Sequence, residues 1–159
     1  MSGGHDDQDV RLLDGAALER GDDVLVLGGG TLVFGAHDRV GDGWVYVVRS
    51  QVDELEHLLD EAHDNGAAGV AYLVGEAPVL PLPDGAVAAT VGRAAVEPTG
   101  LGEAARELHR VLRPGGRLSL AEPDPGTAAE LRSALAAAGF LAVETASIAS
   151  ETLVTARRP

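Results

Sequence analysis

The sequence predicts a three-layer α/β domain, in which helices cover both faces of a parallel β-sheet. Three observations support this prediction. Short runs of valine, isoleucine and leucine, typical of strands buried on both faces, alternate with segments of helical periodicity. The connections between these segments are short, which favours a parallel sheet with helices on its two sides. The length of 159 residues corresponds to about one domain with a sizeable core.

Seven segments are predicted as strands. The first, Val24–Leu27, is an unbroken apolar run that leads into Gly28, Gly29 and Gly30. The sixth, Leu141–Ile148, begins the C-terminal strand pair. The remaining predicted strands are residues 44–48, 69–74, 86–91, 118–121 and 152–156.

Five segments are predicted as helices, namely residues 10–19, 32–40, 52–62, 103–112 and 127–138. We expect Thr127 to cap the last of them and Gly139 to follow its end. Pro114, Gly115 and Gly116 predict a turn, because proline cannot continue a helix and glycine accepts unusual dihedral angles. Residues 1–9 are polar and acidic and predict a disordered tail, which leaves 10–159 as a single domain.

Composition excludes several classes of function. The formal net charge of −13, with all 12 basic residues arginine, disfavours nucleic acid as a partner. The absence of cysteine excludes disulfides, thiolate metal sites and cysteine nucleophiles. No apolar run approaches the roughly 20 residues of a membrane span, so no membrane association is expected. The polar N-terminus lacks the pattern of a signal peptide, so we expect a cytoplasmic protein.

Two stretches in the second half of the sequence are specific enough to indicate a protein family. They read LPLPDGAVAATVGRAAVE at residues 80–97 and EAARELHRVLRPGGRLSLAEP at residues 103–123. Together they resemble the class I S-adenosylmethionine-dependent methyltransferases, in particular the small-molecule branch called methyltransferase type 11. The resemblance implies a Rossmann-like sheet of seven strands in the order 3-2-1-4-5-7-6, with only the seventh antiparallel. It also implies S-adenosylmethionine as the methyl donor and a small molecule as the acceptor.

The resemblance places a cofactor site around the glycine loop. Relatives have an acidic residue and three glycines in an alternating pattern, whose positions here are Val26, Gly28, Gly30 and Leu32. Glycines there let the backbone approach a ligand, and amides at the following helix start hold a negative group. The residues of this sequence that correspond to the family's cofactor site are Gly28, Gly29, Gly30, Arg49, Ser50, Glu76, Ala77 and Gly92.

Arg49 departs most from the family pattern. Relatives end the second strand with a carboxylate that accepts hydrogen bonds from both ribose hydroxyls. An arginine has donors and no acceptor, and losing a charge-assisted pair costs about 1.5 to 3 kcal/mol. Cofactor binding is therefore expected to be weak or lost. An arginine here also fits the 2′-phosphate of NADP in dinucleotide-binding folds, although the last glycine of that fingerprint is replaced by Val33.

No catalytic residue follows from the sequence. Glu97, just past the fourth predicted strand, is the one candidate base, and the alternative is an exposed loop carboxylate. One group of acidic and histidine side chains recurs at helical spacing and could imitate a metal site: His57, Asp60, Glu61 and Asp64. A solvent-exposed helix face explains this group better than a metal site does. Two hypotheses remain open, an active small-molecule methyltransferase and a degenerate relative that serves as a partner subunit or binds another ligand. In either case, so small a domain is expected to form a homodimer.

Overall fold

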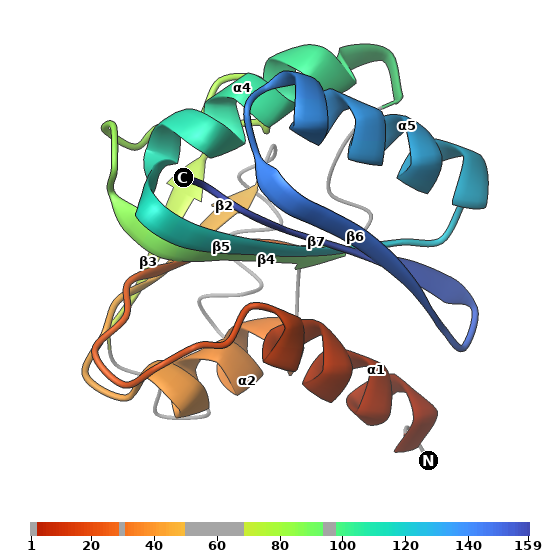
Figure 1. Cartoon of the computed structure of the whole chain (residues 1–159). Helices are drawn as coiled ribbons and strands as arrows, with labels where there is room; N and C mark the ends of the chain where they lie inside the picture. The colour runs from red at the N-terminus through yellow and green to blue at the C-terminus, as the bar shows by residue number, and fades with distance from the viewer. Residues whose placement is uncertain (1–2, 29–30, 50–68, 94–97) are drawn as a thin grey trace.

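The structure, a computed structural model, describes residues 3–28, 31–49, 69–93 and 98–159. They form a seven-stranded sheet with two helices on each face (Figure 1). The strands are β1 (Val24–Leu27), β2 (Val45–Arg49), β3 (Val70–Val74), β4 (Val87–Arg93), β5 (Leu112–Glu122), β6 (Leu141–Ile148) and β7 (Glu151–Arg157). The helices are α1 (Gly3–Gly15), α2 (Thr31–Val40), α4 (Leu101–Val111) and α5 (Pro125–Ala137), with a 3₁₀ turn η1 (Pro98–Gly100).

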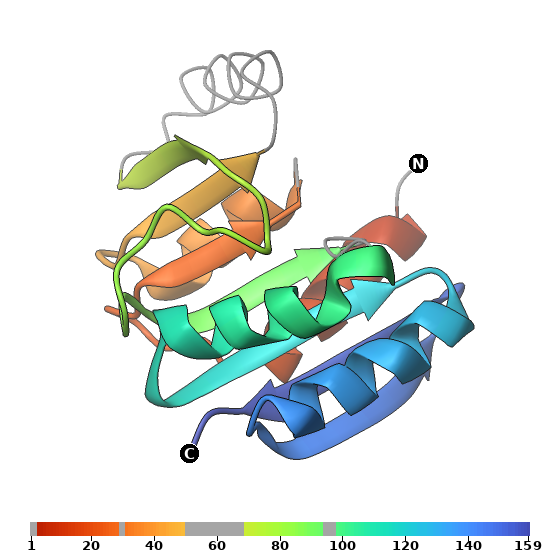
Figure 2. The same cartoon turned by 90° about the horizontal axis from the view of Figure 1, so that it is seen from above.

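The strand order is β3-β2-β1-β4-β5-β7-β6, which confirms the predicted order. Strands β1 to β5 pair in parallel, whereas β7 runs antiparallel to both β5 and β6. Viewed from above in Figure 2, α4 and α5 lie side by side across one face of the sheet. The opposite face is covered by α1 and α2.

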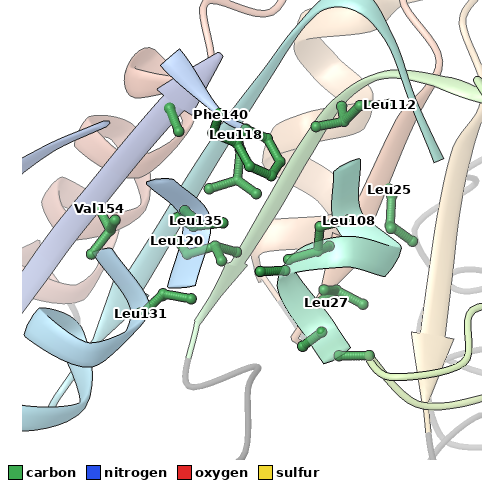
Figure 3. Close-up of a cluster of buried hydrophobic side chains, with 14 of the residues drawn as sticks. Leu25, Leu27, Leu108, Leu112, Leu118, Leu120, Leu131, Leu135, Phe140 and Val154 are labelled. Carbon is green, nitrogen blue, oxygen red and sulfur yellow. The ribbon is translucent and has the colours of Figure 1, made fainter. Parts of the chain in front are cut away.

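Each face of the sheet buries its own apolar cluster. On the face of α4 and α5, the cluster includes Leu108, Leu118, Leu131 and Phe140, and Figure 3 shows these side chains converging between helices and strands. On the face of α1 and α2, Val24 and Val26 pack against buried leucines and valines of the two helices. All four β1 residues are buried, because their side chains alternate between these two clusters.

Three predicted boundaries were wrong. The segment 3–9, expected to belong to a disordered tail, lies in α1, and Asp9 is only 5% exposed. The cap of α5 is Asp124, whose carboxylate accepts from the backbone N–H and the hydroxyl of Thr127, each at 2.8 Å. Pro125 then occupies the first turn, where the missing N–H costs nothing.

The third correction concerns the predicted turn at Pro114, Gly115 and Gly116. These residues lie inside β5, which begins at Leu112 rather than at residue 118. The register against β4 shifts from Val87 opposite Leu112 to Ala89 opposite Arg117, so the extra residues form an irregularity within the strand. Gly115 supplies the positive φ of 80° that this irregularity requires.

Other predictions fall outside the described residues. These are the helix at 52–62 with its acidic and histidine side chains, Ser50, Gly29, Gly30 and Glu97. Within the described ranges, none of the helices combines the length and apolarity needed to cross a bilayer.

Candidate functional site

The order of the strands places the candidate site at the carboxyl end of β1. This strand pairs with β2 on one side and β4 on the other, so the chain's connections run outward from it in both directions. Ligands of open α/β sheets bind in the crevice outside the carboxyl ends of the strands, where the order reverses. At this end Leu27 lies opposite both Val48 and Gly92.

Gly28 follows directly and has little room for a side chain. A Cβ added to it would lie 3.3 Å from the backbone nitrogen of Arg93, closer than most such contacts. Its φ of 142° is also unfavourable for residues that have a Cβ. The backbone of β1 and the end of β4 therefore approach each other closely above the sheet, and Gly92 is buried between Leu27 and Leu120.

The replaced positions Val26 and Leu32 belong to the core. Both are at most 1% exposed and pack in the cluster under α1 and α2. Apolar residues at these positions stabilise the layer beneath the loop by about 1.5 to 3 kcal/mol each relative to exposure. They add no polar group to the crevice.

Arg49 ends β2 one residue beyond the pairing of Leu27 with Val48, so it lies beside Gly28 in register. Its carbonyl accepts a hydrogen bond of 2.8 Å from the N–H of Gly75, which joins the ends of β2 and β3. The structure thus brings Gly28 and Arg49 to the same edge, as the sequence predicted. The arginine remains partly exposed there.

Glu76 and Ala77 follow β3 in a tight turn. The N–H of Val79 donates to the carbonyl of Glu76 at 2.9 Å. Ala77 is 8% exposed and belongs to the cluster under α4, whereas Glu76 is exposed. A ligand at this turn would therefore meet the carboxylate of Glu76 and the backbone of Ala77 rather than its methyl group.

Sequence reasoning missed a buried ion cluster at the same edge. Arg93, the last residue of β4, donates from Nη1 to Asp9 Oδ1 at 2.5 Å and from Nε to Glu151 Oε2 at 2.8 Å. Asp9 also accepts from the hydroxyl of Thr31 at 2.5 Å, which ties α1 to the start of α2. Burial lowers the pKa of Arg93, but its two hydrogen-bonded carboxylates outweigh burial and raise it above the ordinary value. The guanidinium therefore stays charged.

Glu122 is the second residue that the sequence did not single out. It ends β5, is 4% exposed and pairs through its backbone with Thr152 of β7. Burial, and then the negative charges of Asp124 and Glu151, raise the pKa of this carboxyl above the ordinary value. Ionising this carboxyl therefore costs free energy, and the group lies at the ligand-binding edge of the sheet.

Comparisons with known proteins agree with this geometry. A family model described as a methyltransferase domain matches residues 27–120. A ubiquinone/menaquinone biosynthesis C-methyltransferase of Rubrivivax gelatinosus is 36% identical over 103 residues, 64% of this chain and 39% of that protein. A malonyl-[acyl-carrier protein] O-methyltransferase of Erwinia pyrifoliae is 34% identical over 125 residues, 78% and 46% of the two chains. The chain thus spans less than half the length of these curated relatives.

Solved structures show the same fold. A SAM-dependent methyltransferase from Aquifex aeolicus superposes with a TM-score of 0.80 at 22% identity, over 95% of this chain and 89% of that one. A putative methyltransferase of Haloferax volcanii, solved in complex with the Trm112 methyltransferase activator, gives a TM-score of 0.76 at 19% identity, over 98% and 96% of the two chains.

Proposed function

The chain belongs to the class I S-adenosylmethionine-dependent methyltransferase family, and from this premise we propose that it transfers a methyl group to a small molecule. The proposal is supported mainly by the close approach of Gly28 to the end of β4, where an added Cβ would lie 3.3 Å from the backbone nitrogen of Arg93 at the ligand-binding edge of the sheet. S-adenosylmethionine, when bound, supplies a methyl group on a sulfonium, which is activated without any metal or covalent enzyme intermediate.

The residues expected to hold this cofactor lie at the carboxyl edge described above. In the proposal, the loop of Gly28, Gly29 and Gly30 and the backbone at Gly92 flank the amino-acid part. Arg49 and Ser50 lie at the ribose, and Glu76 and Ala77 at the adenine. Glu76 is exposed and free to accept from an adenine amino group, whereas Arg49 offers the ribose donors only. The cofactor is therefore proposed to bind weakly.

Isothermal titration with S-adenosylhomocysteine and S-adenosylmethionine tests the proposal. We expect saturable binding in the micromolar to submillimolar range, weakened at least tenfold by Gly28→Ala, because the added methyl group crowds the backbone of Arg93 and displaces the loop. Gly21→Ala is the matched control, since Gly21 also has a positive φ but nothing within 4 Å of an added Cβ. Absence of heat at millimolar ligand would contradict the proposed function.

A second function has support of its own. Val26 and Arg49 replace acidic residues of the family pattern and Leu32 replaces a glycine, and the Haloferax neighbour was solved in a complex with an activator. A degenerate partner subunit, or a protein with another ligand, would show no binding in the same titration. We propose a cytoplasmic protein in either case, with no role for nucleic acid or membranes, and self-association as a homodimer.

A further inference from the structure

The carboxylate of Asp9 joins two elements that meet beside the glycine loop. Its Oδ1 accepts a hydrogen bond of 2.5 Å from Arg93 Nη1, at the end of β4. Its Oδ2 accepts one of 2.5 Å from the hydroxyl of Thr31, the first residue of α2. The side chain of Asp9 is only 8% exposed, and breaking a buried ion pair is strongly destabilising. Asp9 therefore fixes the start of α2 relative to β4.

Glu151, the first residue of β7, holds the same guanidinium from another side. Its Oε2 accepts from Arg93 Nε at 2.8 Å, and its side chain is also only 8% exposed. The guanidinium is planar and its donors point in fixed directions. It cannot turn without losing Asp9 or Glu151, so Arg93 is a rigid support for Asp9.

Gly28 and Thr31 are both held by Arg93, one directly and the other through Asp9. Gly28 lies against the backbone of Arg93, because an added Cβ would be 3.3 Å from its nitrogen and 3.7 Å from its oxygen. Thr31 reaches the guanidinium of Arg93 through the carboxylate of Asp9. Only two residues separate Gly28 from Thr31 in the sequence. Asp9 and Arg93 therefore set the spacing between Gly28 and the start of α2.

We propose that Asp9 is a positioning residue for the cofactor site, which keeps Gly28 and the start of α2 at the spacing that receives the cofactor. The inference rests on the proposed function and gives a role to α1, which lies outside the residues 27–120 that match the family model. A site that is ordered in advance spares its ligand the entropy cost of ordering it, so the ligand binds more tightly. Asp9 acts through Thr31 and Arg93, since both of its oxygens are occupied by these residues.

A second contact between the same two helices supplies a matched control. Helices α1 and α2 lie together under one face of the sheet (Figure 1), and Arg39 Nη1 of α2 donates to Asp14 Oδ1 of α1 at 2.5 Å. Arg39 lies in the last turn of α2, about 12 Å along the helix from Thr31. Loss of this contact should loosen the helix pair without changing the spacing of Gly28 and Thr31.

Thr31→Val tests the inference without any ligand, because it removes the hydroxyl and keeps the shape and helix propensity of the residue nearly unchanged. The readout is the backbone order parameter from NMR relaxation at the amides of residues 28 and 31. We expect a fall from about 0.85, typical of rigid backbone, toward values below about 0.6. Thr31→Ser, which keeps the hydroxyl, and Asp14→Ala should leave both values unchanged. Unchanged values in Thr31→Val would overturn the inference.

Calorimetric titration with S-adenosylhomocysteine measures the consequence for binding. Thr31→Val should bind about 5- to 30-fold more weakly than the parent, the cost of ordering one backbone residue. Thr31→Ser should restore the affinity, and Asp14→Ala should retain it. Thermal unfolding of each variant separates this effect from stability. A contact that only stabilises the fold would lower the unfolding temperature of Thr31→Val and leave its affinity equal to that of the parent.

The two proposals fail separately. If S-adenosylhomocysteine binds the parent and Thr31→Val equally well, the inference fails and the proposed function stands. If S-adenosylhomocysteine binds none of these proteins, the proposed function fails and the order parameters decide the inference. A fall in Thr31→Val that Thr31→Ser reverses would then support the positioning role of Asp9, and the absence of a fall would overturn it.

Discussion

Arg49 and Gly28 lie side by side at the ends of β2 and β1. The side chain of residue 49 therefore determines which hydrogen-bonding groups a ribose would meet there. We predict that Arg49→Asp raises the affinity for S-adenosylhomocysteine about 10- to 100-fold, because a carboxylate restores the missing acceptor. Calorimetric titration measures the change. Arg49→Gln is the control, because it removes the charge without supplying a charged acceptor. An unchanged affinity in Arg49→Asp would mean that the glycine loop, and not the ribose contact, limits binding.

The raised pKa of Glu122 leads to a prediction about the stability of the folded protein that does not depend on any ligand. The folded protein raises the pKa of this carboxyl, mainly through burial, so folding favours its protonated form. Stability is therefore lost as the pH rises from the ordinary pKa of a glutamate to the raised value, and stays lower above it. We predict that the free energy of unfolding of Glu122→Gln at pH 8 exceeds that of the parent by on the order of 1 kcal/mol, so the variant unfolds at a higher temperature.

The gain in Glu122→Gln should vanish at about pH 3, well below the ordinary glutamate pKa, where the parent carboxyl is protonated in both states. Thermal unfolding followed by circular dichroism at the two pH values gives the comparison. A variant that is less stable than the parent at pH 8 would show that the ionised carboxylate has a stabilising partner. That result would contradict the raised pKa that burial and the neighbouring carboxylates give this group.

At the level of elements, one arginine fixes the proline-rich loop that precedes β4. Arg110 on α4 donates to the carbonyl oxygens of Leu80 and Leu82, at 3.2 and 2.8 Å, and to Asp84 and Glu107. Glu107 in turn accepts from the N–H of Leu80 at 2.7 Å. The turn of Glu76 and Ala77 lies at the start of this loop, so its position depends on the network.

We predict that Arg110→Lys destabilises the fold by about 1 to 3 kcal/mol, because a lysine cannot reproduce the planar fork of donors. Denaturant unfolding measures the loss, and Arg106→Lys on the same helix, at an exposed position, is the control. The hydrogen bond from Arg110 lowers the pKa of Glu107, so this contribution is present above the ordinary glutamate pKa. It should disappear as the pH falls through the lowered value. A loss that is unchanged at acidic pH would contradict the assignment.

The elements that the sequence predicted well are those with a local signal. Val24–Leu27 and Leu141–Ile148 match the structure residue for residue. The first is an uninterrupted apolar run that ends at Gly28, and the second begins two residues after Gly139, which follows the end of the preceding helix. The cap of α5 was misplaced because Asp124 and Thr127 are both good capping residues three positions apart, and Pro125 decides between them. Asp9 was assigned to a tail because its partner Arg93 is 84 residues away.

The residues of the candidate site also fall into those that a local sequence signal predicted and those that depend on residues far away in the sequence. Gly28 and Arg49 were found because their strands end at neighbouring positions of a sheet whose order was implied by resemblance. The cluster of Arg93 with Asp9 and Glu151 was missed, since ion pairs across 84 and 58 residues leave no periodicity in a sequence. Glu122 was missed because burial of a polar strand end depends on how α5 is packed, which no local pattern reports.

At the scale of the whole molecule, the net charge and the exposed edge of the sheet have opposite effects on the association of two copies of the chain. Strand β6 ends the sheet, with seven of its eight residues exposed or partly exposed, and an exposed edge strand is a template for pairing with another chain. The net charge of −13 on 159 residues repels a second copy. Salt screens this repulsion over about 10 Å at 0.1 M and leaves backbone pairing intact.

We therefore predict a homodimer through β6 whose population rises with ionic strength. Light scattering at high protein concentration should approach twice the chain's 16.3 kDa in 0.5 M salt and fall toward the monomer mass at low salt. Ala146→Lys, an exposed change in the middle of β6, should shift the equilibrium to monomer, because lysine on an edge strand disfavours pairing. Ala137→Lys, exposed on α5, is the control and should leave the mass unchanged. A monomer at every salt concentration would show that repulsion outweighs the edge, and that one chain completes its site alone.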